Sequence, residues 1–129
     1  MIVVDAAVVV TALTSDDDRA TRARARIIDS PRAPELIGLE VVSTLRRLTA
    51  AARIEPSRAA LAVTDFVDLP LVLAPHGPLL ARCWELRENV TAYDAAYVAL
   101  AELLEVPLVT MDRRLARAPG LRCEVEVLH

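Results

Sequence analysis

Four acidic residues occupy places in the sequence where they could hold a metal ion. They are Asp5, Glu40, Asp94 and Asp112. Asp5 and Asp112 each follow a short apolar run, as at the end of a buried strand, whereas Glu40 and Asp94 lie near the starts of segments with helical apolar spacing. Four carboxylates in one pocket could not all stay ionised without a cation. The pattern therefore indicates a divalent metal and chemistry on a phosphate group.

Oxygen ligands of this kind suit Mg²⁺, which keeps several waters and needs only one or two direct carboxylates, while two ions would use all four. A water activated in this way attacks a phosphodiester in line and needs no side-chain nucleophile. The sequence has no GxSxG segment, and we expect its two histidines, His76 and His129, to be solvated. It also contains no lysine, which excludes a Schiff base and a GK[ST] phosphate loop.

Each acid by itself also has a structural interpretation. Asp5 and Asp112 could cap helices, Asp94 could complement a helix dipole, and Glu40 could pair with Arg47. These alternatives stay open for the single residues. The carboxylates meet only if the strands before Asp5 and Asp112 are neighbours in a parallel sheet.

The elements that must position the acids follow from the apolar pattern. Strands are expected over residues 2–5, 35–37, 71–73, 107–110 and 121–128. Helices are expected over residues 6–13, 19–29, 39–54, 56–68, 78–89, 93–105 and 113–118. Val41, Leu45, Leu48 and Ala52 form the expected buried stripe of the third helix. The alternation predicts an α/β sandwich whose mainly parallel central sheet, of about five strands, is flanked by helices.

Composition sets further limits. The 129 residues are 54% apolar and 26% charged, which predicts one globular domain over residues 1–129. Aromatic residues make up 3%, so stacking on bases cannot be the main binding mode. No apolar run could span a bilayer and no signal peptide is recognisable, so we expect a cytoplasmic protein without membrane contact. Cys83 and Cys123 form no CxxC pair and are expected to be reduced packing residues.

The segments around the four acids resemble the PIN-domain family, most closely its VapC toxins from bacterial toxin–antitoxin pairs. The resemblance rests on residues 2–5 (IVVD), 39–43 (LEVVS), 91–101 (TAYDAAYVALA) and 108–115 (LVTMDRRL). It extends over almost the whole chain. It implies a PIN-like α/β/α sandwich and an endoribonuclease that depends on Mg²⁺ or Mn²⁺, with the four acids as catalytic residues and metal ligands.

The resemblance also implies residues that support these ligands. Thr110 matches a hydroxyl residue that often stands beside the site, and Ser43 stands where the family often has Asn or another polar residue. Ala7 is a departure, because many relatives carry Ser or Asn two positions after the first Asp. A missing hydrogen bond there could loosen the metal geometry.

Partners are implied in the same way. They are an RNA substrate, a second copy of the chain, and a cognate antitoxin whose tail covers the acidic pocket and whose DNA-binding part binds their promoter. We expect RNA contacts first at Arg113 and Arg114, beside Asp112, because arginine suits bidentate phosphate contacts. Further contacts are expected at Arg19, Arg22 and Arg26.

Two other interpretations remain open. The chain could be a non-catalytic binding module that keeps the fold and captures a partner protein or RNA, and Ala7 is the one feature that favours this. It could also be a phosphoaspartate receiver or an aspartate-nucleophile phosphatase. The absence of lysine opposes the receiver, and Ala7 stands where the phosphatase needs a second Asp.

Overall fold

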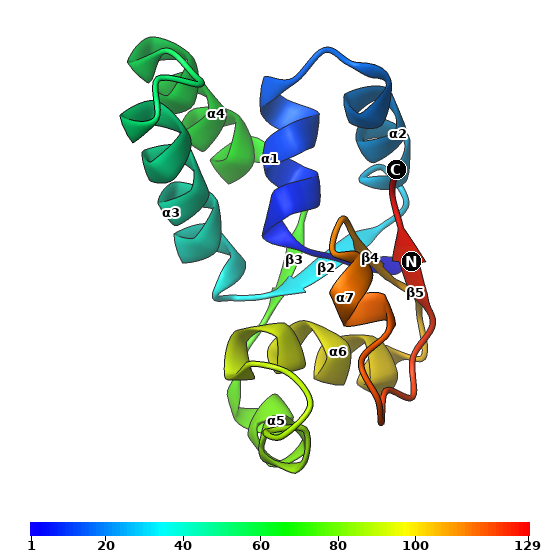
Figure 1. The fold of residues 1–129 in the computed structure, drawn as a ribbon. Helices are drawn as coiled ribbons and strands as arrows, with labels where there is room; N and C mark the ends of the chain where they lie inside the picture. The colour runs from blue at the N-terminus through cyan, green and yellow to red at the C-terminus, as the bar shows by residue number, and fades with distance from the viewer.

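The computed structural model describes residues 1–129 and contains one sheet of five parallel strands, in the order β3-β2-β1-β4-β5 (Figure 1). The strands are β1 (Ile2–Val4), β2 (Pro31–Pro34), β3 (Val72–Ala74), β4 (Leu108–Thr110) and β5 (Val125–Val127). All four neighbouring pairs run parallel. The predicted fold class, an α/β sandwich with a mainly parallel five-stranded sheet, is confirmed.

Helices cover both faces of the sheet. One face carries α1 (Ala6–Thr14), α2 (Asp18–Arg26), α3 (Ile37–Ala50) and α4 (Pro56–Asp68) (Figure 1). The other face carries α5 (Leu80–Glu85), which follows a short 3₁₀ turn, and α6 (Ala92–Leu104). The short α7 (Arg113–Ala116) packs beside β5. None of the helices combines the length and apolar composition that crossing a lipid bilayer requires.

The centre of the sheet is its most deeply buried part. All residues of β1 and β4 are buried, and their unbroken apolar runs suit strands covered on both faces. Val3 of β1 pairs with Arg32 of β2 on one side and with Leu108 of β4 on the other. The chain thus builds the sheet outward from β1 in both directions, and the strand order reverses between β1 and β4.

The expected strand over residues 35–37 is wrong: β2 lies at Pro31–Pro34, and α3 already begins at Ile37. Pro31 and Pro34 break the preceding helix, but they do not prevent a strand. They stand at the two ends of β2, where a missing amide costs the fewest ladder bonds, and the strand forms between β1 and β3 in spite of them.

Other boundaries move less. The closing strand is confined to Val125–Val127, and the helix expected over 78–89 is divided between the 3₁₀ turn Gly77–Leu79 and α5. In α3, the side chains of Val41 and Leu45 are buried as expected, but Ala52 lies beyond the end of the helix and is exposed.

The expectation of a solvated histidine is wrong for His76, whose Nε2 accepts a hydrogen bond from the Leu36 amide at 3.0 Å. This contact supports the first turn of α3, which has no side-chain cap of its own.

Candidate active site

All four acids predicted from the sequence line a single pocket of about 250 Å³. Asp5 directly follows β1, and Asp112 lies two residues beyond β4, the neighbouring strand. The pocket therefore lies at the carboxyl ends of the strands where the strand order reverses, which is the usual place for a ligand in an open α/β sheet. Glu40 and Asp94 reach the same pocket from α3 and α6.

Two of these acids also cap helices. Asp5 Oδ1 accepts the Val8 amide at 3.1 Å at the start of α1, and Asp112 Oδ1 accepts the Arg114 amide at 2.8 Å at the start of α7. The structural interpretation of these two residues is therefore correct, and yet both carboxylates also line the pocket. Each carboxylate has two oxygens, so capping with one of them leaves the other for a second contact.

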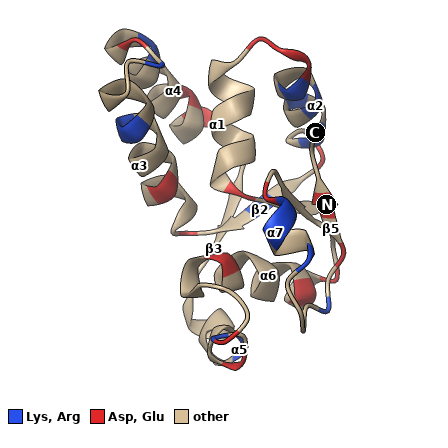
Figure 2. Cartoon of the chain, viewed as in Figure 1, with Lys and Arg blue, Asp and Glu red and all other residues tan.

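The remaining two acids stand in the first turns of their helices, Glu40 in α3 and Asp94 in α6. The N-terminal ends of four helices therefore meet at the pocket, and Figure 2 shows acidic segments near the starts of α1, α3 and α6, close to α7. The positive ends of these helix dipoles offset part of the mutual repulsion between the carboxylates.

Thr110 joins the two strand ends that carry acids. Its side chain is fully buried; its hydroxyl donates to Asp5 Oδ2 and accepts the Asp112 amide at 3.0 Å. Ser43 and Ala7 also line the pocket, Ser43 on α3 and Ala7 in the first turn of α1. Ala7 offers only a methyl group there.

Glu40 does not pair with Arg47, the partner considered from the sequence. Its Oε1 accepts instead from the Tyr97 hydroxyl at 2.6 Å. Burial, together with the Glu40 carboxylate, raises the pKa of Tyr97, so this hydroxyl stays protonated and donates. Tyr97 is not among the residues predicted from the sequence, although its position three residues after Asp94, on the same face of α6, is a signal that the sequence contains.

The electrostatics of the pocket favour uptake of a cation. Burial raises the pKa of Asp5 to about 6, and the charges of Asp94 and Glu40 add to the increase although hydrogen bonds from Thr110 and Val8 oppose it. Burial and the charge of Asp112 likewise raise the pKa of Asp94. Two of the four acids are therefore harder to ionise than an ordinary aspartate, and a bound cation would reverse this.

The donor set suits a hard divalent ion, although no three of the His, Cys, Asp and Glu side chains stand as a ready cluster able to hold one. Mg²⁺ is commonly bound through one or two carboxylates and several waters, so it does not require three protein ligands around one point. The carboxylates of Asp5, Asp94, Asp112 and Glu40 line a pocket with room for waters between them.

The predicted RNA-contacting arginines divide into two groups. Arg113 and Arg114 begin α7 beside the pocket, and the Arg114 guanidinium lies 3.9 Å from the Asp112 carboxylate. The other three lie on α2, and two of them hold the C-terminal segment. Arg26 pairs with Glu126 at 2.8 Å, Arg22 donates to the His129 carbonyl, and Arg19 is exposed. The role of all five in RNA binding stays a prediction.

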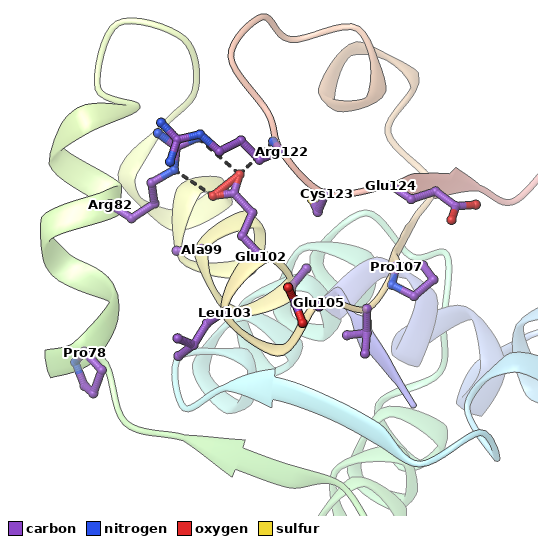
Figure 3. Close-up of a pocket in the computed structure, with 12 residues that line it drawn as sticks. Pro78, Arg82, Ala99, Glu102, Leu103, Glu105, Pro107, Arg122, Cys123 and Glu124 are labelled. Carbon is purple, nitrogen blue, oxygen red and sulfur yellow. Dashed lines mark hydrogen bonds and ion pairs between the residues drawn. The ribbon is translucent and has the colours of Figure 1, made fainter.

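A larger pocket of about 650 Å³ lies at the other end of α6, between α5 and the segment before β5 (Figure 3). Its central carboxylate belongs to Glu102, which binds Arg82 at 2.6 Å and the Arg122 amide at 2.8 Å. Burial alone would raise the pKa of Glu102, but these donors outweigh it and lower the pKa. Because Glu102 is already fully engaged, this larger pocket is the weaker candidate.

Known proteins resemble this chain along its whole length. The PIN domain model matches residues 2–121. Ribonuclease VapC1 of Mycobacterium tuberculosis is 44% identical over 128 residues, which cover 98% of this chain and 96% of VapC1. The M. tuberculosis toxin VapC20, described as cleaving the sarcin-ricin loop, superposes over the full length of both chains with a TM-score of 0.73 at 18% identity.

A third likeness is to VapBC2 of Rickettsia felis, solved with a DNA fragment from its promoter. It gives a TM-score of 0.67 at 14% identity over 97% of this chain and 98% of that one. At these low identities the two structural likenesses show the fold alone. The domain match and the identity to VapC1 show more: the chain belongs to the PIN-domain family, in its VapC group. The resemblance inferred from the motifs is confirmed.

Proposed function

We propose that this protein is an endoribonuclease that depends on Mg²⁺ or Mn²⁺ and acts as the toxin of a toxin–antitoxin pair. One observation carries the proposal: four carboxylates from four separate elements line one pocket at the reversal point of the sheet. The names of the relatives, which include Ribonuclease VapC1 and Ribonuclease VapC12, support RNA as the substrate.

In this proposal, Asp5, Asp94, Asp112 and Glu40 hold the metal, directly or through waters. A metal bound there lowers the pKa of a water and stabilises charge on the phosphate. Thr110 fixes the orientation of the Asp5 carboxylate by hydrogen bonding, and Tyr97 does the same for Glu40.

Replacement of Asp94 tests the proposal. Asp94→Asn keeps the size of the side chain and removes one ligand charge, so RNA cleavage should fall by at least about 100-fold. The measurement is cleavage of a labelled RNA by purified protein in Mg²⁺ or Mn²⁺ and in EDTA, with circular dichroism as the check on folding. Wild-type rates in the Asp94→Asn and Asp5→Asn variants, or in EDTA, would contradict a role for the acids.

We also propose that the protein forms a homodimer and is held inactive by an antitoxin, whose tail covers the acidic pocket and whose DNA-binding part binds their promoter. The VapBC2 complex on promoter DNA supports this arrangement by analogy. Co-expression with the product of the adjacent gene, followed by size-exclusion chromatography and a cleavage assay, tests it. We expect a stable complex without nuclease activity, and separate elution with full activity would contradict it.

A binding module remains the alternative, because Ala7 leaves the pocket without a polar side chain at that position. Calorimetric titration with Mn²⁺ separates the two functions. The nuclease requires heat of binding at or below millimolar concentration, which Asp5→Asn removes, whereas a module that only captures a partner requires none.

A further inference from the structure

Arg47 is the only basic residue that lines the acidic pocket. It lies on α3 in line with Glu40 and Thr44, because spacings of four and three residues place side chains on one helical face. All three residues line the pocket. Along this face of α3, Arg47 therefore lies two turns after Glu40.

The Arg47 guanidinium is free to receive an anion. It lines the same pocket as four carboxylates, yet it forms no ion pair with any of them. Its one hydrogen bond runs from Nη2 to Thr44 Oγ1 at 3.2 Å. Of the five N–H donors of a guanidinium, most therefore remain available, and Thr44 restrains the direction in which they point.

Several other arginines of the chain already have partners. Arg26 and Arg82 form ion pairs with Glu126 and Glu102, while Arg24 and Arg87 donate to backbone carbonyls. Arg47 differs because it is the one cation inside the pocket and it pairs with no acid there.

From this geometry we infer that Arg47 binds a phosphate of the RNA strand at the edge of the acidic pocket, an inference that rests on the proposed nuclease function. RNA carries one negative charge per nucleotide, so a pocket lined by four acids repels every phosphate except the one that the metal neutralises. Arg47 supplies a bidentate partner for a neighbouring phosphate and so holds the strand in register with the reacting group.

The neighbouring residue supplies a matched control. Arg46 is on the same helix and is exposed, but it does not line the pocket. Arg47→Ala and Arg46→Ala therefore remove the same charge from the same helix, and they change the overall attraction of the protein for a polyanion equally. Only the contribution of the pocket differs.

The experiment uses the full chain with Asp94→Asn as an inactive background, and a fluorescein-labelled single-stranded RNA in Mg²⁺. Fluorescence anisotropy should show that Arg47→Ala weakens RNA binding by about tenfold relative to the background. The affinity of Arg47→Lys should lie between those of Arg47→Ala and the background, and the affinity of Arg46→Ala should stay within about twofold of the background. The slope of log K against log salt should become shallower by about 0.7 for Arg47→Ala, as for one lost phosphate contact on a single strand.

In the active protein, Arg47→Ala should raise KM more than it lowers kcat, because the phosphate it binds is not the reacting one. Equal RNA affinity and equal salt slopes for Arg47→Ala and Arg46→Ala would overturn the inference, and so would a loss confined to antitoxin binding. If the wild-type protein neither bound nor cleaved RNA, the proposed nuclease function would fail together with the inference. The failure of the inference alone is therefore distinguishable from the failure of the proposed function.

Discussion

Helix α6 carries a carboxylate near each end, and the two carboxylates have opposite surroundings. Asp94, in the first turn, faces the acidic pocket, where burial and the charge of Asp112 raise its pKa. Glu102, near the last turn, faces Arg82 (Figure 3), and the donors around it lower its pKa although burial opposes this. Burial raises the pKa of both carboxylates, so it is the donors around Glu102 that turn its shift to the opposite direction.

The comparison separates an acid that the fold neutralises from one that it leaves without a matching cation. Glu102 joins α6 to α5 through Arg82 and to the C-terminal segment through the Arg122 amide, so its charge is used within the fold. The acidic pocket gathers more negative charge than the fold neutralises, and the repulsion between these carboxylates is a cost to stability in the absence of a cation. Such a cost at a pocket is what a site for a cation requires.

The largest expected effect concerns Asp5, whose pKa of about 6 exceeds the unfolded value of 3.8. The folded protein binds this proton more tightly than the unfolded chain does. Its contribution to stability is therefore fully present below about pH 4 and is lost as the pH rises to about 6. Asp5→Asn should remove this dependence and stabilise the metal-free protein at pH 7 by up to about 3 kcal/mol.

Urea unfolding in EDTA across pH 4 to 7 measures the effect of Asp5→Asn. Asp29→Asn serves as the control, because the N-terminal amine lowers the pKa of Asp29, and this change should therefore destabilise at neutral pH. Mg²⁺ should stabilise the wild type and not Asp5→Asn. If Asp5→Asn and Asp29→Asn both stabilised or both destabilised the protein at neutral pH, the contrast between Asp5, which has no cationic partner, and Asp29, which has one, would fail.

Glu102→Gln is expected to have the next largest effect. Unlike a substitution in the acidic pocket, it should lower stability and leave RNA cleavage nearly unchanged. The side chains of Glu102 and Arg82 are only 11% and 18% exposed, so neutralising the carboxylate should cost about 2 kcal/mol of unfolding free energy. RNA cleavage at 25 °C should stay within about twofold of wild type, in contrast to Asp94→Asn on the same helix. A cleavage defect as large as that of Asp94→Asn would show that the two ends of α6 are not functionally separate.

Tyr97→Phe should produce a smaller effect, confined to the acidic pocket. The ring stays in place, but Glu40 loses the hydroxyl at 2.6 Å that orients it. The concentration of Mn²⁺ needed for half-maximal cleavage should rise by about tenfold. Tyr93→Phe is the matched control, since Tyr93 lies on the same helix, is 67% exposed and does not line the pocket. Identical metal dependence in both variants would remove Tyr97 from the site.

The sequence predicted the parts of the site that depend on local pattern. Asp5 and Asp112 could be found because each follows a buried strand, and parallel strands place their carboxyl ends on one edge. Glu40 and Asp94 are less distinctive, because an acid is favoured in the first turn of any helix, and their assignment rested on the resemblance of their segments to the PIN-domain family. Asp5 and Asp112 meet only because β1 and β4 are neighbours in the sheet, which no local pattern determines.

The parts that were missed depend on contacts between distant segments. The bond from Tyr97 to Glu40 joins residues 57 positions apart, and the bond from His76 to Leu36 joins residues 40 apart. Strand β2 was misplaced because proline propensity is a local property, whereas the strand is held by its two neighbours in the sheet. Tertiary packing decided each of these cases.

The smallest expected effect tests whether the acidic pocket lacks a hydrogen-bonding side chain at position 7. Ala7 lines the pocket from the first turn of α1, at the position where the family resemblance led us to expect Ser or Asn. In Ala7→Ser, a hydroxyl becomes available to a carboxylate or to a metal-bound water, and we expect about two- to threefold tighter Mn²⁺ binding by calorimetry. Ala25→Ser on the exposed side of α2 controls for the small cost of serine in a helix.

The Ala7→Ser result bears directly on the difference between the two ends of α6. Around Glu102 the donors already match the carboxylate, so an added hydroxyl has no partner to gain there, whereas the acidic pocket has more acceptors than donors. Tighter metal binding would therefore show that the pocket retains unfilled hydrogen-bonding capacity and that its acids still act as ligands. If neither the wild-type chain nor Ala7→Ser bound Mn²⁺, the result would instead favour the binding module, because the acids would then be present without a cation to hold.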